Sequence, residues 1–359
     1  MDNLEEKIGQ MVIIRMFGKE ITEELIEMIR DYKVGGIILY SRNYDSYEEM
    51  MNLVNQLREL NKKYNKYPLF ISTDQEGGRV NRMPREFKNI NSASKLISNE
   101  SISLVEEAGR VTGCMLNISG FNMNFAPVLD IQRFDDSHAI GDRCFGKLKE
   151  NVSQFAIPYM KAMKNENVIP VVKHFPGHGA TKKDSHFLLP IVTKPLEELE
   201  RDDMEPFIDA INNGADAIMV SHIIISKVDK LYPASISRKF IKKYLKDKFN
   251  YKGLIITDDL KMKSISILYG YKRAFTRAIF AQNDIVMIGA TYDHVKACIN
   301  EAKKMVNKST FLQQQVNESF EKIISKKEEY GIKDDTVEML SDEAIAKLNK
   351  RIEEINSRA

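Results

Sequence analysis

The chain has 359 residues, of which 43% are hydrophobic and 29% charged, and its formal net charge at pH 7 is +2. This length allows one large barrel or two ordinary domains, and the hydrophobic content is enough for a substantial core. Because the charge is nearly balanced and no long basic block precedes the C-terminal region, we expect neither nucleic acid nor a membrane as a partner.

The cysteines and the N-terminal segment indicate the compartment. Cys114, Cys144 and Cys298 are scattered without CxxC spacing, so neither a disulfide framework nor a cysteine zinc site is expected. Residues 1–20 start with acidic side chains, and their apolar run is too short for a signal peptide or a membrane span. We therefore expect a cytoplasmic protein.

Short apolar runs alternate with amphipathic segments of helical length almost to the end of the chain. Eight runs resemble strands and cover residues 11–15, 36–40, 69–73, 123–129, 169–175, 217–222, 254–257 and 285–288. Seven of them have clear helical connectors, and the first run is the weakest. This alternation predicts an α/β fold, a (β/α)8 barrel of the TIM type, rather than an open sheet.

Helix signals between the runs support this prediction. Residues 22–33 have apolar side chains at helical spacing, residues 46–62 begin at a serine cap, and residues 237–248 are amphipathic with a basic end. After the eighth run the sequence is helical, charged and poor in loops. We expect a catalytic barrel over residues 1–300, followed by C-terminal helices packed on it over residues 301–359.

Polar or ionisable side chains follow strand after strand. In TIM-type barrels the reacting groups lie at the C-terminal ends of the strands. The residues concerned are Arg42 and Asn43 after the second run, Asp74 and Glu76 after the third, Asp130 after the fourth, Lys173 and His174 in the fifth, His222 ending the sixth, and Asp258 and Asp259 after the seventh. Chance solvation explains this concentration poorly, so a site at the barrel mouth is predicted.

Two acidic strand ends stand out. Asp258 follows a fully apolar strand, so its carboxylate can point into the barrel mouth, whereas its neighbour Asp259 is expected to turn toward the adjacent helix as an N-cap. Asp74 precedes the pair Gly77 and Gly78, which would let the backbone approach a ligand closely.

The segment 171–190, VVKHFPGHGATKKDSHFLLP, concentrates histidines in a loop punctuated by glycine and proline. In a turn, Asp184 can hydrogen-bond the ring of His186, fix its tautomer and stabilise its protonated form. This arrangement suits a histidine that acts as acid and base. The alternatives are a solvated loop, a core histidine at position 174, or a zinc site built from this cluster, which includes His178.

A carboxylate opposite a protonatable histidine, with further polar groups around them, suits cleavage of a glycosidic bond. The oxocarbenium-like transition state needs a nearby anion, and the leaving oxygen needs a proton. In a retaining scheme, Asp258 attacks the anomeric carbon. His186, oriented by Asp184, protonates the leaving group and then activates water.

Several motifs carry a family resemblance. These are DQEGGRV (74–80), NMNFAPVLDI (122–131), IGDRCFG (140–146), KHFPGHG (173–179) with DSH (184–186), MVSHI (219–223) and TDDLKM (257–262). Together, and in this order, they resemble the family 3 glycoside hydrolases, and more narrowly the single-domain bacterial β-N-acetylglucosaminidases (β-N-acetylhexosaminidases) of cell-wall recycling. The resemblance spans nearly the whole chain.

The resemblance implies roles for individual residues. Asp258 would be the nucleophile, and Asp184 with His186 the acid/base dyad. Residues implied to hold the N-acetylglucosamine unit are Asp74, Arg82, Arg143, Lys173 and His174. His178 would be a structural loop residue, His222 would pack near the pocket floor, and neither a metal nor a cofactor is implied. The sequence departs from the family pattern at Ala180, Cys144 and Asn283, none of which removes a catalytic group.

The predicted function is that of a retaining exo-β-N-acetylglucosaminidase. It would hydrolyse terminal non-reducing β-linked N-acetylglucosamine, from muropeptides in peptidoglycan recycling, through a covalent glycosyl-enzyme intermediate. Alternatives on the same fold are a β-N-acetylglucosaminide phosphorylase and a β-glucosidase. Alternatives from other classes are a metal-dependent amidohydrolase and a sugar-binding barrel without activity. A monomer is favoured as the oligomeric state.

Overall fold

A computed structural model describes residues 3–133, 140–178 and 189–359 of the chain. Eight parallel strands form one sheet in the order β10-β1-β2-β3-β4-β5-β7-β9, and an isolated parallel bridge between Ile256 and Ile285 joins its two edges. The strands are β1 Val12–Arg15, β2 Gly36–Ile38, β3 Phe70–Thr73, β4 Met123–Asn124, β5 Ile169–Phe175, β7 Ala217–Val220, β9 Leu254–Thr257 and β10 Val286–Ile288. The predicted (β/α)8 barrel is confirmed.

Each of the eight barrel strands falls within one of the predicted runs, but several of them end before the run does. The fourth run is the clearest case, because the ladder of β4 stops at Asn124, and farther on Val128 makes only an isolated bridge to Lys173. Pro127 lies between them and has no N–H to donate to a ladder. The apolar run therefore predicted where the strand lies, but it overestimated how long the strand is.

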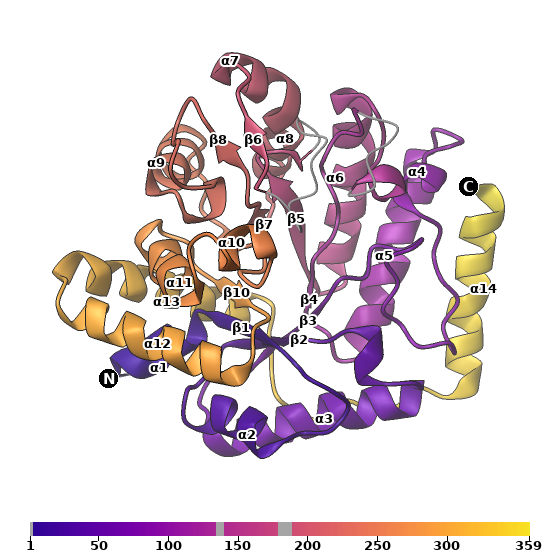
Figure 1. The fold of residues 1–359 in the computed structure, drawn as a ribbon. Helices are drawn as coiled ribbons and strands as arrows, with labels where there is room; N and C mark the ends of the chain where they lie inside the picture. The colour runs from indigo at the N-terminus through magenta and orange to yellow at the C-terminus, as the bar shows by residue number, and fades with distance from the viewer. Residues whose placement is uncertain (1–2, 134–139, 179–188) are drawn as a thin grey trace.

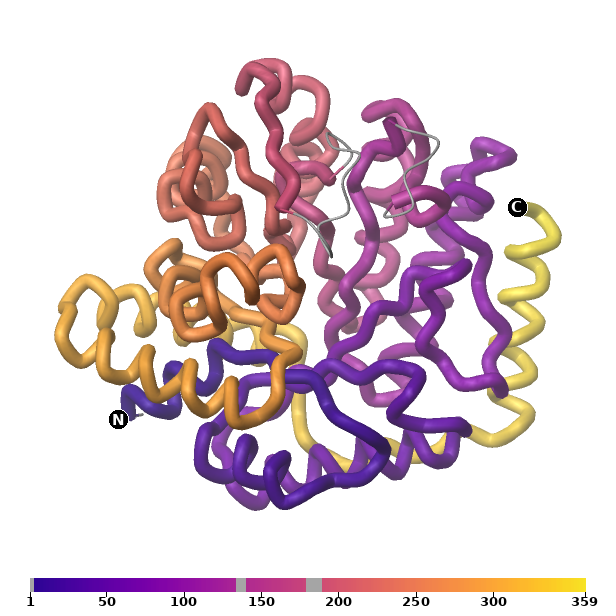
Figure 2. The backbone as a smooth tube through the Cα atoms, in the orientation of Figure 1, coloured from indigo at the N-terminus to yellow at the C-terminus, as the bar shows by residue number. Residues whose placement is uncertain are grey.

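Helices surround the barrel (Figures 1 and 2). Helix α1 Leu4–Gln10 precedes β1. The helices between the strands are α2 Glu23–Arg30, α3 Tyr47–Tyr64, α5 Ile102–Ile118, α6 Lys149–Asn165, α8 Glu205–Asn212 and α11 Tyr271–Phe280, with the shorter α4 Ala93–Leu96, α7 Leu196–Leu199 and α10 Lys263–Ser266. The expected serine cap is present, since Ser46 Oγ accepts a hydrogen bond from Glu49 N at 3.2 Å. The predicted helix at 237–248 begins as α9 Arg238–Phe240 and continues as a π-helix over Ile241–Lys248.

A small second sheet was not predicted. Strands β6 Ile191–Val192 and β8 Ile224–Ile225 pair in parallel, outside the barrel ladder and beyond β5 and β7 (Figure 1). Each has two residues, too few for a hydrophobic period to register in the sequence.

The C-terminal region consists of α12 Tyr292–Asn307, α13 Thr310–Glu329 and α14 Asp342–Arg358. The prediction that it is poor in loops is wrong, because residues 331–341 form an irregular segment between α13 and α14. Backbone and side-chain bonds hold this segment against the barrel, for example Leu69 N to Asp334 Oδ1 at 3.2 Å. It carries the chain to the far side, where α14 lies along α5 and Arg351 pairs with Glu107 at 2.6 Å (Figure 1).

The core fills the barrel and the layer between strands and helices with buried aliphatic and aromatic side chains. At the N-terminal end of the barrel, Lys327 of α13 is buried, and its Nζ donates to Gln10 Oε1, Gly35 O and Pro68 O. None of the helices in the described ranges combines the length and apolar character needed to cross a membrane.

Candidate active site

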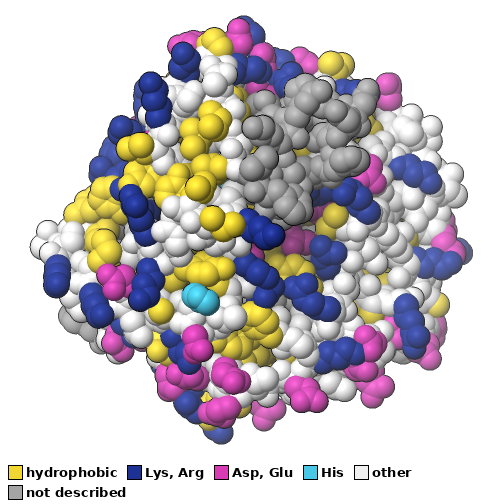
Figure 3. Space-filling model, in the orientation of Figure 1, with side chains coloured by type: hydrophobic (Ala, Val, Ile, Leu, Met, Phe, Trp, Pro, Cys, Tyr) yellow, Lys and Arg dark blue, Asp and Glu magenta, His cyan; other side chains and the backbone are white. Residues whose placement is uncertain are grey.

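A pocket of about 530 Å³ opens at the C-terminal ends of the strands. Its lining comes from strand ends all around the barrel: Arg15, Tyr40, Arg42, Asp74, Glu76, Val80, Arg82, Arg143, Lys173, His174, Met219, Asp258, Asp259, Lys261, Met262, Lys263 and Met287. Figure 3 shows Lys and Arg side chains gathered around the hollow at the centre of this face. The predicted mouth of the barrel is thus a cavity of the size that small ligands occupy.

Six of the eight predicted site residues line this one pocket, although they span almost two hundred positions of the chain. They are Asp74, Arg82, Arg143, Lys173, His174 and Asp258. The other two, Asp184 and His186, lie outside the described residues. Their assignment therefore stays a prediction.

Lys173 is the best-defined cation of the pocket. It is almost completely buried, and its Nζ lies 2.8 Å from Asp74 Oδ1 and 2.6 Å from Glu76 Oε1. Arg143 donates two hydrogen bonds of 2.8 Å to the carboxylate of the same Glu76, from Nε and Nη2. Burial alone would raise the pKa of Glu76, but the charges of Lys173 and Arg143 outweigh it and hold that pKa well below its usual value.

The sequence placed Glu76 after the third run without assigning it a role, and in the structure Glu76 is the shared counter-ion of Lys173 and Arg143. Because its ionised carboxylate holds two cations from β5 and from the loop near residue 143, both are fixed before any ligand arrives. The sequence hides this role, since Lys173 lies 97 positions away and only the barrel brings the two together.

Asp130 is a second buried carboxylate whose role was missed. Its Oδ2 lies 2.6 Å from His174 Nδ1 and 3.2 Å from the backbone N of His174, and its Oδ1 accepts from His178 N at 2.5 Å. Burial opposes ionisation of Asp130, but its interactions with His174 and His178 hold the pKa below the usual value. Since the carboxylate takes the Nδ1 edge, the Nε2 edge of His174 is left to face the pocket.

Asp258 and Asp259 follow β9 and both line the pocket. Asp258 Oδ1 accepts from Asp259 N at 2.7 Å, and Asp258 N donates to Val220 O of β7. The expectation of an N-cap at Asp259 is wrong, because α10 begins only at Lys263 with Met262 as its N-cap.

The Asp259 carboxylate instead links two strand ends. Its Oδ1 accepts from Lys261 N and from Gly289 N, which follows β10. Burial raises the pKa of Asp259, and these two backbone donors offset only part of that effect. His222 is fully buried and supports the same loop, since its Nε2 lies 3.0 Å from Asp259 O.

The pair Gly77 and Gly78 is required by the backbone of the loop after β3. Both residues adopt positive φ, of 87° and 55°. A Cβ at Gly77 would lie 2.8 Å from Asn91 O, and one at Gly78 would lie 2.6 Å from Ser92 Cβ. The glycines therefore let the loop after β3 turn tightly against residues 90–92.

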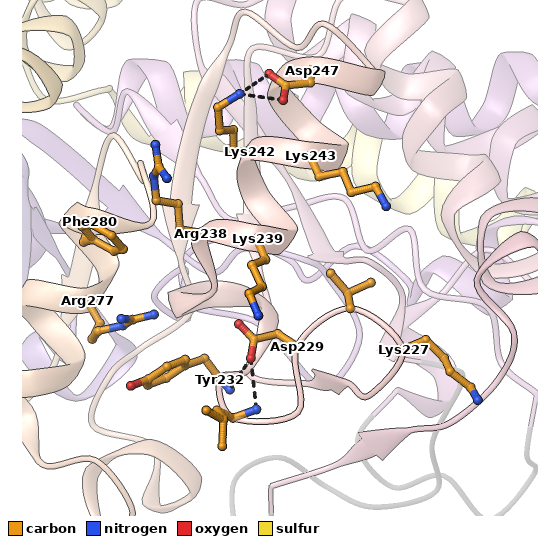
Figure 4. Close-up of a pocket in the computed structure, with 12 residues that line it drawn as sticks. Lys227, Asp229, Tyr232, Arg238, Lys239, Lys242, Lys243, Asp247, Arg277 and Phe280 are labelled. Atoms are coloured by element: carbon orange, nitrogen blue, oxygen red, sulfur yellow. Dashed lines mark hydrogen bonds and ion pairs between the residues drawn. The ribbon is translucent and has the colours of Figure 1, made fainter. Parts of the chain in front are cut away.

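A larger hollow of about 680 Å³ lies outside the barrel mouth, beside α9 and α11 (Figure 4). It is basic, and among the described residues its lining includes no histidine and none of the predicted site residues. Its two carboxylates are already engaged: Asp229 accepts from Leu231 N and Ser237 Oγ, and Asp247 pairs with Lys242. We therefore place the active site at the barrel mouth.

The family profile described as "Glycosyl hydrolase family 3 N terminal domain" matches residues 3–326. The chain belongs to glycosyl hydrolase family 3. Relatives named "Beta-hexosaminidase" include one from Haemophilus influenzae, 32% identical over 85% of this chain and 86% of the relative, and one from Tolumonas auensis, 35% identical over 75% and 80%. A solved structure of a family 3 beta-N-acetylglucosaminidase from Paenibacillus sp. str. FPU-7 is 30% identical, with a TM-score of 0.91, and the match covers 99% of this chain and 69% of that one.

Family membership confirms the predicted enzyme class, glycoside hydrolase, and overturns the amidohydrolase and the inactive sugar-binding barrel. Within the described ranges, no group of three or more His, Cys, Asp or Glu side chains is arranged to hold a metal ion. Chemically, the pocket offers a carboxylate at Asp258 and a wall of fixed donors and acceptors from β3 and β5. The donors and acceptors can hydrogen-bond sugar hydroxyls, and the carboxylate can stabilise an oxocarbenium-like centre.

Proposed function

We propose that the protein is a retaining exo-β-N-acetylglucosaminidase that removes terminal, non-reducing β-linked N-acetylglucosamine. One observation carries the proposal: Asp258 shares its pocket with the preorganised network of Asp74, Glu76, Arg143 and Lys173. The names of the relatives, Beta-hexosaminidase and beta-N-acetylglucosaminidase, support the choice of an acetamido sugar.

Asp258 acts as the nucleophile in this proposal. Its carboxylate attacks the anomeric carbon, the glycosidic C–O bond breaks, and the leaving oxygen takes a proton from His186, which Asp184 orients. His186 then takes a proton from water, and the water oxygen attacks the anomeric carbon and releases Asp258. Two inversions give net retention of configuration.

The wall from β3 and β5 holds the sugar. Asp74 accepts hydrogen bonds from ring hydroxyls, while Lys173, Arg143 and the Nε2 edge of His174 contact the oxygens on the same side. Because Glu76 and Asp130 already fix these groups, little side-chain entropy is lost when the sugar binds. Arg82 completes the wall, with its backbone N fixed to Gln75 Oε1 at 2.7 Å.

Hydrolysis of 4-nitrophenyl β-N-acetylglucosaminide beside the matching β-glucoside tests the proposal. We expect release from the acetamido sugar, the same product with and without phosphate, and a loss of about 10³-fold or more in kcat for Asp258→Ala. Preference for the glucoside would favour a β-glucosidase, and a sugar phosphate as product would favour a phosphorylase. An Asp258→Ala protein with normal circular dichroism and undiminished turnover would end the assignment.

The acid/base role of His186 has a separate test. His186→Ala should slow natural disaccharides far more than aryl glycosides, because a nitrophenolate leaves without needing a proton. Equal losses on both substrate types would contradict the assigned role.

The natural substrate, location and assembly belong to the same proposal. We propose muropeptides as substrates, the cytoplasm as the compartment and a monomer as the working form, with residues 301–359 as a C-terminal extension of one domain. Products from purified muropeptides, cell fractionation and light scattering of the full chain check these points in turn.

A further inference from the structure

The basic hollow beside α9 and α11 lies apart from the proposed reaction, since its lining shares no residue with the pocket at the barrel mouth. Three segments form it: the loop after β8, the helix that begins as α9, and α11 (Figure 4). Two carboxylates, those of Asp229 and Asp247, face six cations in the lining, which are Lys227, Arg238, Lys239, Lys242, Lys243 and Arg277. The hollow therefore carries an excess of positive charge.

The two carboxylates leave five of these six cations unpaired. Asp247 accepts two hydrogen bonds from Lys242 Nζ, at 3.0 Å and 2.7 Å. Asp229 is buried, and its oxygens accept hydrogen bonds from Leu231 N at 3.0 Å and from Ser237 Oγ at 2.7 Å. Within the described ranges, the other five cations of the lining form no ion pair with a carboxylate.

Arg238 and Arg277 are the most enclosed of the five, because both are half-buried whereas the lysines of the lining are exposed. Arg277 Cζ lies 3.7 Å from the ring centroid of Tyr232, and Arg238 Cζ lies 4.7 Å from that of Phe311 on α13. The ring of Phe280 lies between the two arginines, 5.2 Å from Arg277 Cζ and 5.4 Å from Arg238 Cζ (Figure 4). Aromatic faces therefore hold both guanidinium groups in place without neutralising them.

The N–H groups of both arginines lack acceptors in the described part of the chain. Nε of each is buried and has no hydrogen-bond partner there. The Nη groups of both also donate to no described residue, but they are not buried, so a ligand in the hollow can reach them. A guanidinium group presents its donors in a planar fork that matches the oxygens of a phosphate group.

We propose that this hollow binds a small ligand that carries two or more phosphate groups. Arg238 and Arg277 donate to phosphate oxygens, and Lys239 and Lys243 at the rim neutralise the remaining negative charge. More than one phosphate is required because a phosphate monoester carries at most about two negative charges at pH 7, fewer than the five unpaired cations. The inference does not depend on the proposed glycosidase reaction.

The shape of the hollow favours a small ligand over a macromolecular surface. Its volume of about 680 Å³ is in the range of small-molecule pockets. A flat membrane surface would meet the exposed lysines, but it would not reach the half-buried guanidinium groups beside Phe280. We therefore assign the hollow to a free phosphorylated compound.

A competing explanation is that Arg238 and Arg277 only support the fold by packing on aromatic rings. In that case, replacing either arginine would lower the free energy of unfolding, but the wild-type protein would have no preference for a polyanion. Phosphate binding predicts instead that affinity for a polyanion depends on these two side chains.

Isothermal titration of the full chain with inorganic tripolyphosphate and with inorganic phosphate separates these explanations. Tripolyphosphate should bind wild type about tenfold or more tightly than inorganic phosphate, and its affinity should weaken as salt is raised. Arg238→Met and Arg277→Met should each weaken the binding of tripolyphosphate by about tenfold. Arg85→Met removes the same charge from an exposed position outside the hollow and should keep the wild-type affinity.

The barrel mouth also contains cations, so a further variant locates the bound ligand. Lys261→Met alters the mouth alone and should keep the wild-type affinity for tripolyphosphate. Affinity that is lost in Lys261→Met and retained in both arginine variants would overturn the inference. If the arginine variants fail to fold, the double variant Lys239→Glu/Lys243→Glu at exposed positions should still weaken binding by about tenfold.

Three further results would overturn the inference. They are no binding of tripolyphosphate by wild type, equal affinity for tripolyphosphate and inorganic phosphate, and binding to phosphatidylglycerol vesicles without binding to tripolyphosphate. The last result would assign the basic surface to a membrane instead.

Discussion

Lys173 and Lys327 are both buried lysines, at opposite ends of the same barrel, and they are stabilised in different ways. At the mouth, Lys173 Nζ contacts two carboxylates, those of Asp74 and Glu76. At the other end, Lys327 Nζ donates to three uncharged oxygens, at 2.8 Å, 3.1 Å and 2.5 Å, and lies 4.6 Å from the ring centroid of Phe70.

The two environments suit different roles, ligand binding for Lys173 and support of the fold for Lys327. Carboxylates compensate the charge of Lys173, so an ionised side chain stays fixed where a ligand can use it. Uncharged oxygens satisfy the hydrogen bonds of Lys327 without cancelling its charge, and burial lowers its pKa to about 7. Lys327 instead ties α13 to the segments that lead into β2 and β3.

The comparison is tested most directly by activity. Lys173→Met should lower kcat/KM by about 10²- to 10³-fold, because the sugar loses a preorganised donor and Asp74 is released from its position. Steady-state hydrolysis of 4-nitrophenyl β-N-acetylglucosaminide measures this. Lys161→Met, at an exposed position on α6, is the control. Equal activity of the two variants would show that Lys173 does not contribute to substrate binding or catalysis.

The next effect is on stability at the mouth. Glu76→Gln keeps the shape of the side chain but leaves Lys173 and Arg143 without their shared counter-ion. The free energy of unfolding should fall by about 3–5 kcal/mol, as measured by urea denaturation. Glu59→Gln, at an exposed position on α3, should change it by less than about 0.5 kcal/mol. If Glu76→Gln were as stable as wild type, the ion pairs of Glu76 with Lys173 and Arg143 would not contribute to the free energy of unfolding.

At the far end of the barrel, the expected effect is smaller and concerns stability alone. Lys327→Met should retain full hydrolytic activity, yet cost about 1–3 kcal/mol of unfolding free energy at neutral pH, because three buried acceptors lose their donor. Loss of activity without loss of stability would contradict a purely architectural role.

The cost should also depend on pH. Because burial lowers the pKa of Lys327 from 10.5 to about 7, the unfolded chain binds more protons than the folded chain between these values. The free energy of unfolding of wild type should therefore rise, relative to that of Lys327→Met, as pH increases from 7 toward 10. Parallel pH profiles of the two proteins would show that Lys327 stays protonated in the fold.

The sequence predicted the barrel because each strand is a short apolar run, and runs of that kind are visible without tertiary information. It did not predict β6 and β8, which have two residues each, or the irregular segment 331–341, whose partners lie far away in the chain. These features depend on what the barrel brings alongside them.

The site was predictable where a motif carried it. Asp74, Lys173 and Asp258 were found by resemblance and strand position, and they line one pocket. Glu76 and Asp130 were named as strand-end side chains, but their roles were not predicted, because the role of a buried carboxylate depends on partners that only folding supplies.

The position of Lys327 also bears on where the chain can be cut. The family match ends at residue 326, one position before this lysine, and the segment that follows crosses the barrel before α14 packs on α5. Trimming the gene at residue 326 would delete both Lys327 and the segment 331–341 that holds α14 against the barrel. The region matched by the family profile is therefore shorter than the part of the chain that packs into one fold.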